Sequence, residues 1–240
     1  MQLIILSAGK GSRLPVKFRK RPKCLVELNY KPLLQYNENF FKRFKNKIIV
    51  AGYKQKYLDK FTKNNGFLKI INKEYSSTNM VYSLFLTKKK INQDVVIIYG
   101  DIIFNQNIFN MLKPKKNILP VNINWLKNWK NRMSMQNILN DAENLFIKNN
   151  YLSEIGTKID KQKIPKYQFM GIIKLRKKAF LMCYNFFKKL NDQKIDMTSF
   201  LNLCIKNKII SLKTEIYKDY WFEVDTIYDQ KFAEREIKKW

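Results

Sequence analysis

The chain has 240 residues, of which 45% are hydrophobic, enough to bury the core of one domain and too many for a disordered chain. It carries 47 Lys and Arg against 19 Asp and Glu, and this net charge of +28 predicts attraction to polyanions such as nucleoside triphosphates, nucleic acid or acidic membrane. It contains no histidine, which excludes Ser-His-Asp and Cys-His catalysis, His-ligated zinc and a histidine general base.

Short apolar runs alternate with helical patterns over the first hundred residues. The runs expected to form buried strands are 3–6, 48–52, 67–71 and 95–99. Helices are expected over 33–44, 53–63 and from a cap at Thr78 or Asn79 to about residue 90. This alternation is typical of β-α-β units and predicts an α/β protein whose parallel sheet is covered on both faces.

The second half of the chain is less regular. Strands are expected over 118–123, 169–175 and 209–217, and helices over 178–190, 198–207 and 229–239. There is no internal repeat and no Gly/Ser-rich linker, which favours one domain.

Cysteine usage and apolar run length bear on the compartment. Cys24, Cys183 and Cys204 lie far apart, so reduced thiols are expected rather than a zinc ribbon or a disulfide framework. No apolar run approaches the roughly 20 residues of a transmembrane helix. The first residues lack the basic segment of a signal peptide, and we expect a cytoplasmic protein.

A glycine-containing turn follows the first predicted strand, in the segment Leu6-Ser7-Ala8-Gly9-Lys10-Gly11-Ser12-Arg13-Leu14. Glycines let the backbone approach a phosphate and present N–H groups to it. A Rossmann fingerprint would need Gly in place of Leu14, and a Walker A loop would need Gly-Lys-Ser/Thr after a longer spacing. The turn alone fits either a phosphate-binding loop or an ordinary strand–loop connection.

The following segment, Pro22-Lys23-Cys24-Leu25, extends the turn to Leu-Ser-Ala-Gly-x-Gly-Ser-Arg-Leu-x7-Pro-Lys-x-Leu. This pattern resembles the signature of nucleotidyltransferases that join an NTP to a phosphorylated small molecule. Their family includes sugar-phosphate nucleotidyltransferases and the cytidylyltransferases for phosphocholine and phosphonates.

Three further segments match this family in the expected order, so the resemblance spans residues 1 to about 235. Residues 79–84 resemble the segment that replaces the sugar enzymes' Gly-Thr-Ala motif at the nucleotide base in the phosphocholine and phosphonate branch. Gly100-Asp101 and the Glu223-Val224-Asp225 motif stand where the family places two metal-binding aspartates. Residues 125–132, 141–143, 155–158 and 167–171 resemble the subgroup that activates aminoethylphosphonate or phosphoglutamine.

The resemblance implies a Rossmann-like three-layer α/β/α sandwich with a central, mostly parallel mixed sheet. It implies a single domain over 1–240, with 1–115 as the nucleotide-binding half and 116–240 as the acceptor half. Arg13 and Lys23 would act on the phosphates, while Asp101 and Asp225 would hold Mg²⁺ or Mn²⁺. The implied nucleotide-binding residues are Leu6, Ser7, Ala8, Gly9, Gly11, Ser12, Tyr53, Asn79 and Ser83. The implied acceptor-binding residues are Lys158, Trp125, Tyr167 and Glu223.

The reaction that the resemblance implies is transfer of CMP from CTP to a small phosphonate or phosphorylated amine or amino acid, with release of pyrophosphate. A phosphate monoester has a second pKa near 6, so the nucleophile is ionised at pH 7 and needs no general base. The lack of histidine is therefore no obstacle, since the reaction depends on positioning and charge neutralisation. A cationic acceptor such as phosphocholine would need an aromatic or acidic site, for which Trp125, Trp129, Tyr167, Trp221 and Glu154 are candidates.

Alternatives remain open on the sequence alone. A sugar-1-phosphate nucleotidyltransferase is disfavoured by the missing Gly-Thr-Ala motif. A nucleic-acid-binding protein is disfavoured because no binding module is recognisable and the basic residues are dispersed, so no nucleic-acid partner is expected. Asn79 and Ser83 are also explained as a helix cap and a packed hydroxyl, and the tryptophans as core residues. The charge fits either biased composition or peripheral association with anionic membrane, and the oligomeric state is not determined.

Overall fold

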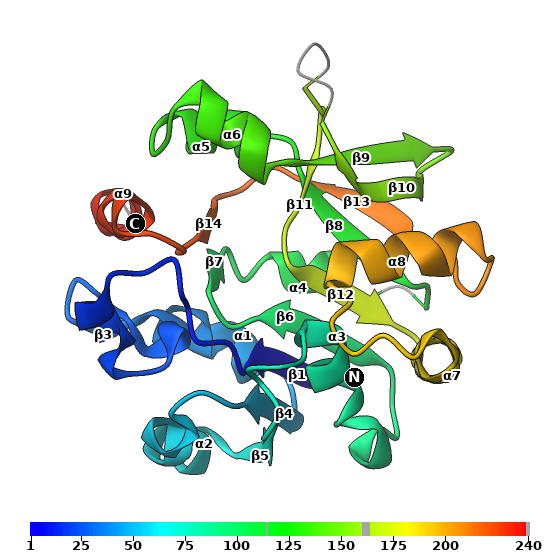
Figure 1. The fold of residues 1–240 in the computed structure, drawn as a ribbon, viewed down its shortest axis with the longest axis horizontal. Helices are drawn as coiled ribbons and strands as arrows, with labels where there is room; N and C mark the ends of the chain where they lie inside the picture. The colour runs from blue at the N-terminus through cyan, green and yellow to red at the C-terminus, as the bar shows by residue number, and fades with distance from the viewer. Residues whose placement is uncertain (114, 160–163, 239–240) are drawn as a thin grey trace.

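A mixed ten-stranded sheet forms the centre of the computed structural model, which describes residues 1–113, 115–159 and 164–238 (Figure 1). The strands, in spatial order, are β5 (Phe67–Ile71), β4 (Asn46–Ala51), β1 (Gln2–Ser7), β6 (Val95–Tyr99), β12 (Ile172–Leu175), β8 (Ile118–Asn122), β13 (Lys213–Tyr217), β10 (Tyr151–Lys158) and β9 (Glu143–Lys148), with β11 (Gln168–Phe169) beside β8. Strands β12, β10 and β11 run against the other seven. The predicted central, mostly parallel mixed sheet is confirmed.

Strand β1 is central because it is apolar on both sides. It pairs in parallel with β4 and β6, so that Ile4 aligns with Ile48 and Ile97. Its side chains alternate between two hydrophobic clusters, with Leu3 and Ile5 on one face of the sheet and Ile4 and Leu6 on the other. A strand buried on both faces requires helices on both faces.

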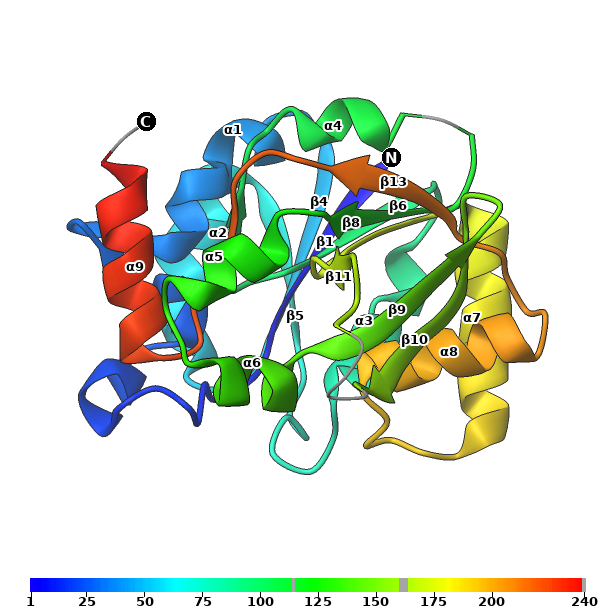
Figure 2. The same cartoon turned by 90° about the horizontal axis from the view of Figure 1, so that it is seen from above.

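Helices cover both faces of the sheet, as the view from above shows (Figure 2). One layer consists of α3 (Met80–Phe85), α7 (Lys177–Leu190) and α8 (Met197–Lys206). The opposite cluster receives side chains from α1 (Glu38–Phe41), α2 (Asp59–Asn65), α4 (Ile108–Met111), α5 (Trp125–Lys130) and α6 (Met135–Asp141). The predicted three-layer α/β/α sandwich is therefore confirmed. None of the helices in the described ranges is long and apolar enough to span a membrane.

The last helix, α9 (Ile227–Ile237), packs on a small separate sheet of β7 (Ile102–Phe104) and β14 (Trp221–Glu223). It lies at the opposite end of the molecule from α7 in both views (Figures 1 and 2). A two-residue turn at Asn29-Tyr30 joins the short strands β2 (Glu27–Leu28) and β3 (Lys31–Pro32). Short 3₁₀ helices complete the chain at Val16–Lys20, Lys23–Leu25, Leu33–Asn37, Gln55–Leu58 and Lys88–Lys90.

Several segments differ from the sequence prediction. The strand expected over 169–175 is divided into β11 and β12, the strand expected over 209–217 begins only at Lys213, and the helix expected to about residue 90 ends as α3 at Phe85. The helix expected over 33–44 is instead a 3₁₀ helix followed by the short α1, because the buried Asn37 leaves helical geometry and donates its amide to the Ile102 carbonyl at 2.8 Å. The β9–β10 hairpin was not predicted. Its turn residues, Asn149 and Asn150, both have positive φ, which is the conformation of a two-residue hairpin turn.

The aromatic cluster beneath α1 provides a test of the core. The Phe40 ring meets the rings of Phe44 and Phe104 edge-on, at centroid distances of 5.1 and 5.0 Å. Phe40→Ala should lower the free energy of unfolding by about 3–5 kcal/mol because it leaves a cavity. The control Tyr30→Ala, at a residue that is 98% exposed, should change it by less than about 0.5 kcal/mol. Denaturant titrations that give both variants the same stability would contradict this packing.

Candidate active site

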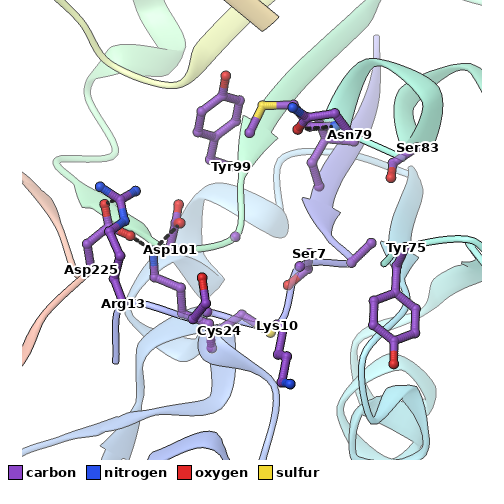
Figure 3. A pocket seen from close by; sticks show the side chains of 18 of the residues that line it. Ser7, Lys10, Arg13, Cys24, Tyr75, Asn79, Ser83, Tyr99, Asp101 and Asp225 are labelled. Atoms are coloured by element: carbon purple, nitrogen blue, oxygen red, sulfur yellow. Dashed lines mark hydrogen bonds and ion pairs between the residues drawn. The ribbon is translucent and has the colours of Figure 1, made fainter. Parts of the chain in front are cut away.

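The loops that follow β1, β5 and β6 lie at the carboxyl ends of these parallel strands, where open α/β sheets bind ligands. There they enclose a cavity of about 370 Å³, the first cavity (Figure 3). Its lining comprises residues 6–13, Lys23, Cys24, Tyr75, Thr78, Asn79, Met80, Ser83, residues 99–101 and Asp225. The structure thus brings together nearly all of the residues that the sequence assigned to the nucleotide, the phosphates and the metal.

The glycine loop is shaped to hold an anion. Gly11 has a φ of +65°, which favours glycine, and a Cβ there would lie 3.1 Å from the Lys23 side chain. A Cβ at Gly9 would meet no atom within 4 Å, so this part of the backbone faces open space. The N–H groups of residues 9–12 have no backbone hydrogen-bond partner among the described residues. They remain free to donate to phosphate oxygens.

Four charged side chains meet at one end of the first cavity, the charged end (Figure 3). The Lys23 Nζ lies 2.6 Å from Asp101 Oδ2 and also pairs with Asp225. Arg13 Nη2 lies 2.7 Å from the other carboxylate oxygen of Asp225. Burial alone would lower the pKa of Lys23, but the two aspartates raise it above its ordinary value, so the ammonium keeps its charge.

The same end fits a divalent cation. Oxygen atoms of Asp101, Glu223 and Asp225 lie within 4.8 Å of one another, and Asp101 Oδ1 is buried with no hydrogen-bond partner among the described residues. Burial, with Asp225 and Asp101 adding to it, raises the pKa of Glu223 well above its ordinary value. Carboxylate oxygens are the ligands that Mg²⁺ prefers. Glu223 therefore lies beside the two aspartates that were predicted to hold the metal. The sequence indicates this position, because the Glu-x-Asp spacing places both side chains on one side of an extended chain.

The opposite end of the first cavity is lined by Tyr75, Thr78, Asn79 and Ser83 (Figure 3). Asn79 caps α3, since its Oδ1 accepts the Met80 N–H at 2.8 Å. The Ser83 hydroxyl accepts a hydrogen bond from Asn72 at 2.9 Å, and it donates to no acceptor among the described residues. Tyr75 and Thr78 were not predicted from the sequence.

Tyr53 does not line the first cavity but supports it from behind. Its N–H donates to the Ala8 carbonyl at 2.9 Å, and its ring lies edge-on to Tyr75 at 6.1 Å. Cys24 does line the cavity, and burial raises the pKa of its thiol to about 12. The neutral thiol is a poor nucleophile at pH 7.

A second cavity of about 230 Å³ adjoins the first and shares Arg13, Met80, Tyr99 and Asp225 with it. Its remaining lining residues come mostly from the second half of the chain: Ile102, Trp129, Asp141, Glu143, residues 168–171, residues 196–198, Trp221 and Glu223. A ligand there would lie beside the charged end, with Arg13 between the two spaces.

Four residues that the sequence named for the acceptor do not line either cavity. Glu154 is half-buried on β10 and accepts a hydrogen bond from the Thr157 hydroxyl at 2.8 Å. Trp125 is in the core, where its ring meets Trp129 edge-on and its indole N–H donates to the Pro165 carbonyl at 3.2 Å. Tyr167 packs half-buried against the core, and Lys158 is exposed at the end of β10. Glu223 does line the second cavity, as do Trp129 and Trp221.

An ion pair that the sequence did not reveal supports the charged end. Asp229, which is only 1% exposed, accepts hydrogen bonds from the N–H groups of Asp225 and Thr226 at 3.0 and 2.7 Å. Arg132, from the turn after α5, pairs with the same carboxylate. Asp229 therefore holds the loop that carries Asp225, and Arg132, from the turn after α5, holds Asp229.

The crowding of carboxylates around Glu223 predicts a pH-dependent stability. Because burial raises the pKa of Glu223 above that of the unfolded chain, its ionisation costs stability, and wild-type stability falls as pH rises through the raised pKa. In EDTA, Glu223→Gln should melt a few degrees above wild type at about pH 8 and close to it at about pH 5. The control Glu215→Gln, on β13 and outside both cavities, should show no such trend. A difference in melting temperature between Glu223→Gln and wild type that does not grow with pH would contradict this crowding of carboxylates.

Comparison with known proteins gives one family match and several relatives. Residues 3–115 match the family model of the MobA-like NTP transferase domain. A CTP:phosphoglutamine cytidylyltransferase of Campylobacter jejuni is 31% identical over 95% of this chain and 97% of its own length. A choline-phosphate cytidylyltransferase of Streptococcus pneumoniae is 35% identical over 45% of this chain and 48% of its own. The solved structure of a CTP:phosphocholine cytidylyltransferase from Streptococcus pneumoniae superposes with a TM-score of 0.79, covers 98% of both chains and is 21% identical, which supports the fold.

Proposed function

The chain belongs to the nucleotidyltransferase family, and from this premise we propose that it is a CTP-dependent cytidylyltransferase. It transfers CMP to a small phosphonate or to a phosphorylated amine or amino acid, and releases pyrophosphate. The observation that carries this proposal is the junction of the two cavities. Arg13 and Asp225 line both spaces, so a nucleotide in the first cavity and a phosphorylated acceptor in the second would meet at the charged end.

The proposed reaction needs no proton transfer from the protein. An ionised oxygen of the acceptor's phosphate or phosphonate forms a bond to the α-phosphorus of CTP. The bond from that phosphorus to the bridging oxygen of the β-phosphate breaks, and its electron pair leaves with pyrophosphate. The chain's part is to hold both anions in line and to neutralise the charge that collects between them.

The glycine loop and the charged end of the first cavity would supply these functions. The free N–H groups of the glycine loop bind the triphosphate, and Arg13 neutralises the departing pyrophosphate. Lys23, kept charged by its aspartate partners, contacts the α-phosphate and the incoming oxygen. Neither role requires histidine, in agreement with its absence from the chain.

We further propose that Asp101 and Asp225, with Glu223 beside them, hold Mg²⁺ or Mn²⁺. Such an ion would supply charge neutralisation to the triphosphate and orient it. The partnerless Asp101 Oδ1 and the raised pKa of Glu223 support this proposal, because a cation would relieve both.

The first experiment measures pyrophosphate release with Mg²⁺. It crosses the four NTPs against phosphocholine, aminoethylphosphonate, phosphoglutamine and glucose 1-phosphate. We expect turnover with CTP and a phosphonate or phosphorylated amine or amino acid. Turnover with UTP or dTTP and glucose 1-phosphate would instead identify a sugar-phosphate nucleotidyltransferase. No turnover, together with no thermal stabilisation by CTP, would contradict the proposal.

The metal site is tested by Asp101→Ala and Asp225→Ala. Either change removes a carboxylate ligand and should abolish metal-dependent turnover, while circular dichroism shows an intact fold. The matched control is Asp59→Ala, because Asp59 lies on α2, outside both cavities, and pairs with Lys69 at the surface. The control should keep wild-type turnover. Near-normal activity in either test variant would show that the metal is held elsewhere.

Lys23 generates a separate prediction because its ammonium lies between Asp101 and Asp225. Lys23→Met should lower the rate by about 10²–10³-fold, since it removes a fixed charge at the reacting phosphorus. In the absence of nucleotide the same variant should bind Mn²⁺ more tightly than wild type, because the competing ammonium is gone. Electron paramagnetic resonance of free Mn²⁺ measures this affinity. An unchanged affinity would show that Lys23 does not compete with the ion.

A further inference from the structure

The second cavity has a charge opposite to that of the chain as a whole. Basic residues outnumber acidic ones by 47 to 19 in the sequence. The cavity reverses this ratio, because five carboxylates and one guanidinium line it: Asp141, Glu143, Asp196, Glu223, Asp225 and Arg13. The part of the cavity lined by carboxylates attracts a cation, while Arg13 is the one basic side chain among its lining residues.

Most of these carboxylates already have partners. Asp225 pairs with Lys23 and Arg13, Glu223 lies beside it in the candidate metal site, and Asp141 lies 3.2 Å from Arg13 Nη1. Asp196 caps α8 and accepts the N–H and hydroxyl of Ser199 at 2.8 and 2.7 Å. Its charge is therefore held in place by the helix.

Glu143, like Asp196 and Glu223, forms no ion pair with any described residue, but it neither caps a helix as Asp196 does nor belongs to the carboxylate group of the candidate metal site as Glu223 does. Its Oε1 is 3.0 Å from the Thr198 hydroxyl, which also lies 2.9 Å from Asp196. Lys158 is opposite Glu143 in the strand register, yet it forms no ion pair with it in the described structure. Burial raises the pKa of Glu143, and Asp196 and Asp141 add to the effect. A bound cation would remove this penalty.

Gln168 gives an independent indication of the ligand. It lines the second cavity, is only 6% exposed, and its Oε1 is buried without a hydrogen-bond partner among the described residues. A buried amide oxygen without a donor is costly, and a ligand N–H would satisfy it. The cavity thus presents a carboxylate and a carbonyl oxygen, both acceptors.

The tryptophans of the cavity are not arranged as an aromatic cage. Trp129 stacks on Trp221 at 6.4 Å, and the Arg132 guanidinium lies 4.7 Å from the Trp129 ring centre. The two rings are only 4% and 3% exposed. A quaternary ammonium needs open ring faces, whereas a primary ammonium needs hydrogen-bond acceptors.

We propose that the second cavity binds the acceptor through a primary ammonium group, which donates to Glu143 and Gln168 while the phosphate or phosphonate lies toward Arg13. This inference rests on the proposed cytidylyltransferase activity and narrows its substrate class. Aminoethylphosphonate, phosphoethanolamine and amino acid phosphates belong to this class. Phosphocholine and sugar phosphates do not.

The test compares phosphoethanolamine with two analogues of similar size, 2-hydroxyethyl phosphate and phosphocholine. The first analogue has no charge at the head group, and the second has charge but no N–H. We expect kcat/KM with CTP and Mg²⁺ to be about 10–100-fold higher for phosphoethanolamine than for either, as expected for a charge-assisted hydrogen bond.

Variants then assign the effect to residues. Glu143→Gln should remove most of the preference for phosphoethanolamine, because it lowers kcat/KM for phosphoethanolamine far more than kcat/KM for 2-hydroxyethyl phosphate. Gln168→Leu should lower the preference by about 3–10-fold, since it removes one neutral acceptor. The matched control Glu215→Gln, on β13 outside both cavities, should behave as wild type. A purely structural role for Glu143 would lower the rate for all three acceptors alike.

Acceptor binding in EDTA with CTP present, measured by calorimetry, separates this inference from the proposed activity. If phosphoethanolamine binds no more tightly than its analogues to wild type, the ammonium site is excluded. The same holds if Glu143→Gln leaves its affinity unchanged. If CTP neither binds nor turns over while phosphoethanolamine still binds selectively through Glu143, the cytidylyltransferase proposal fails and the ammonium site stands.

Discussion

The ion cluster of Lys23 with Asp101 and Asp225 is the contact that joins the site together. Its three members come from the connection after β1, the end of β6 and the loop before α9, and the residue numbers of the two aspartates differ from that of the lysine by 78 and 202. Removing one member of a buried ion pair leaves an unpaired charge, which costs about 3–5 kcal/mol. The cluster therefore fixes the 3₁₀ helix that carries Lys23 against the end of β6 and the loop before α9 in one arrangement.

The surroundings of this cluster serve to keep Asp225 in position. Asp229 binds the N–H group of Asp225, and Arg132 holds Asp229 from the turn after α5. The same turn follows Trp129, which lines the second cavity. The α5 helix and the turn after it therefore contribute both to the wall of the second cavity and to the position of the Asp225 carboxylate. A ligand in either space is positioned by residues from both halves of the chain.

The two cavities of this strongly basic protein differ in the charge of the residues that line them. The first presents N–H groups, Arg13 and Lys23, which attract an anion, while carboxylates line the second. The charges that line the two cavities do not account for the net charge of +28, because no feature of the site requires it. The described basic residues outside the cavities face mostly solvent, as expected for a chain whose lysines are dispersed through its surface helices and loops.

The sequence predicted the α/β class, the strands β1, β4, β5 and β6, the glycine loop, and the four side chains of the charged end. These signals are local: apolar runs, glycines and short motifs keep their meaning without tertiary contacts. It did not determine the β9–β10 hairpin, the 3₁₀ break at Asn37, the Arg132–Asp229 pair or the acidic second cavity. Lys158, Trp125 and Tyr167 were in matching segments yet lie outside both cavities. These features depend on side chains from distant segments that face the same space. Strand order and helix packing bring such side chains together, and spacing along the chain does not specify either of them.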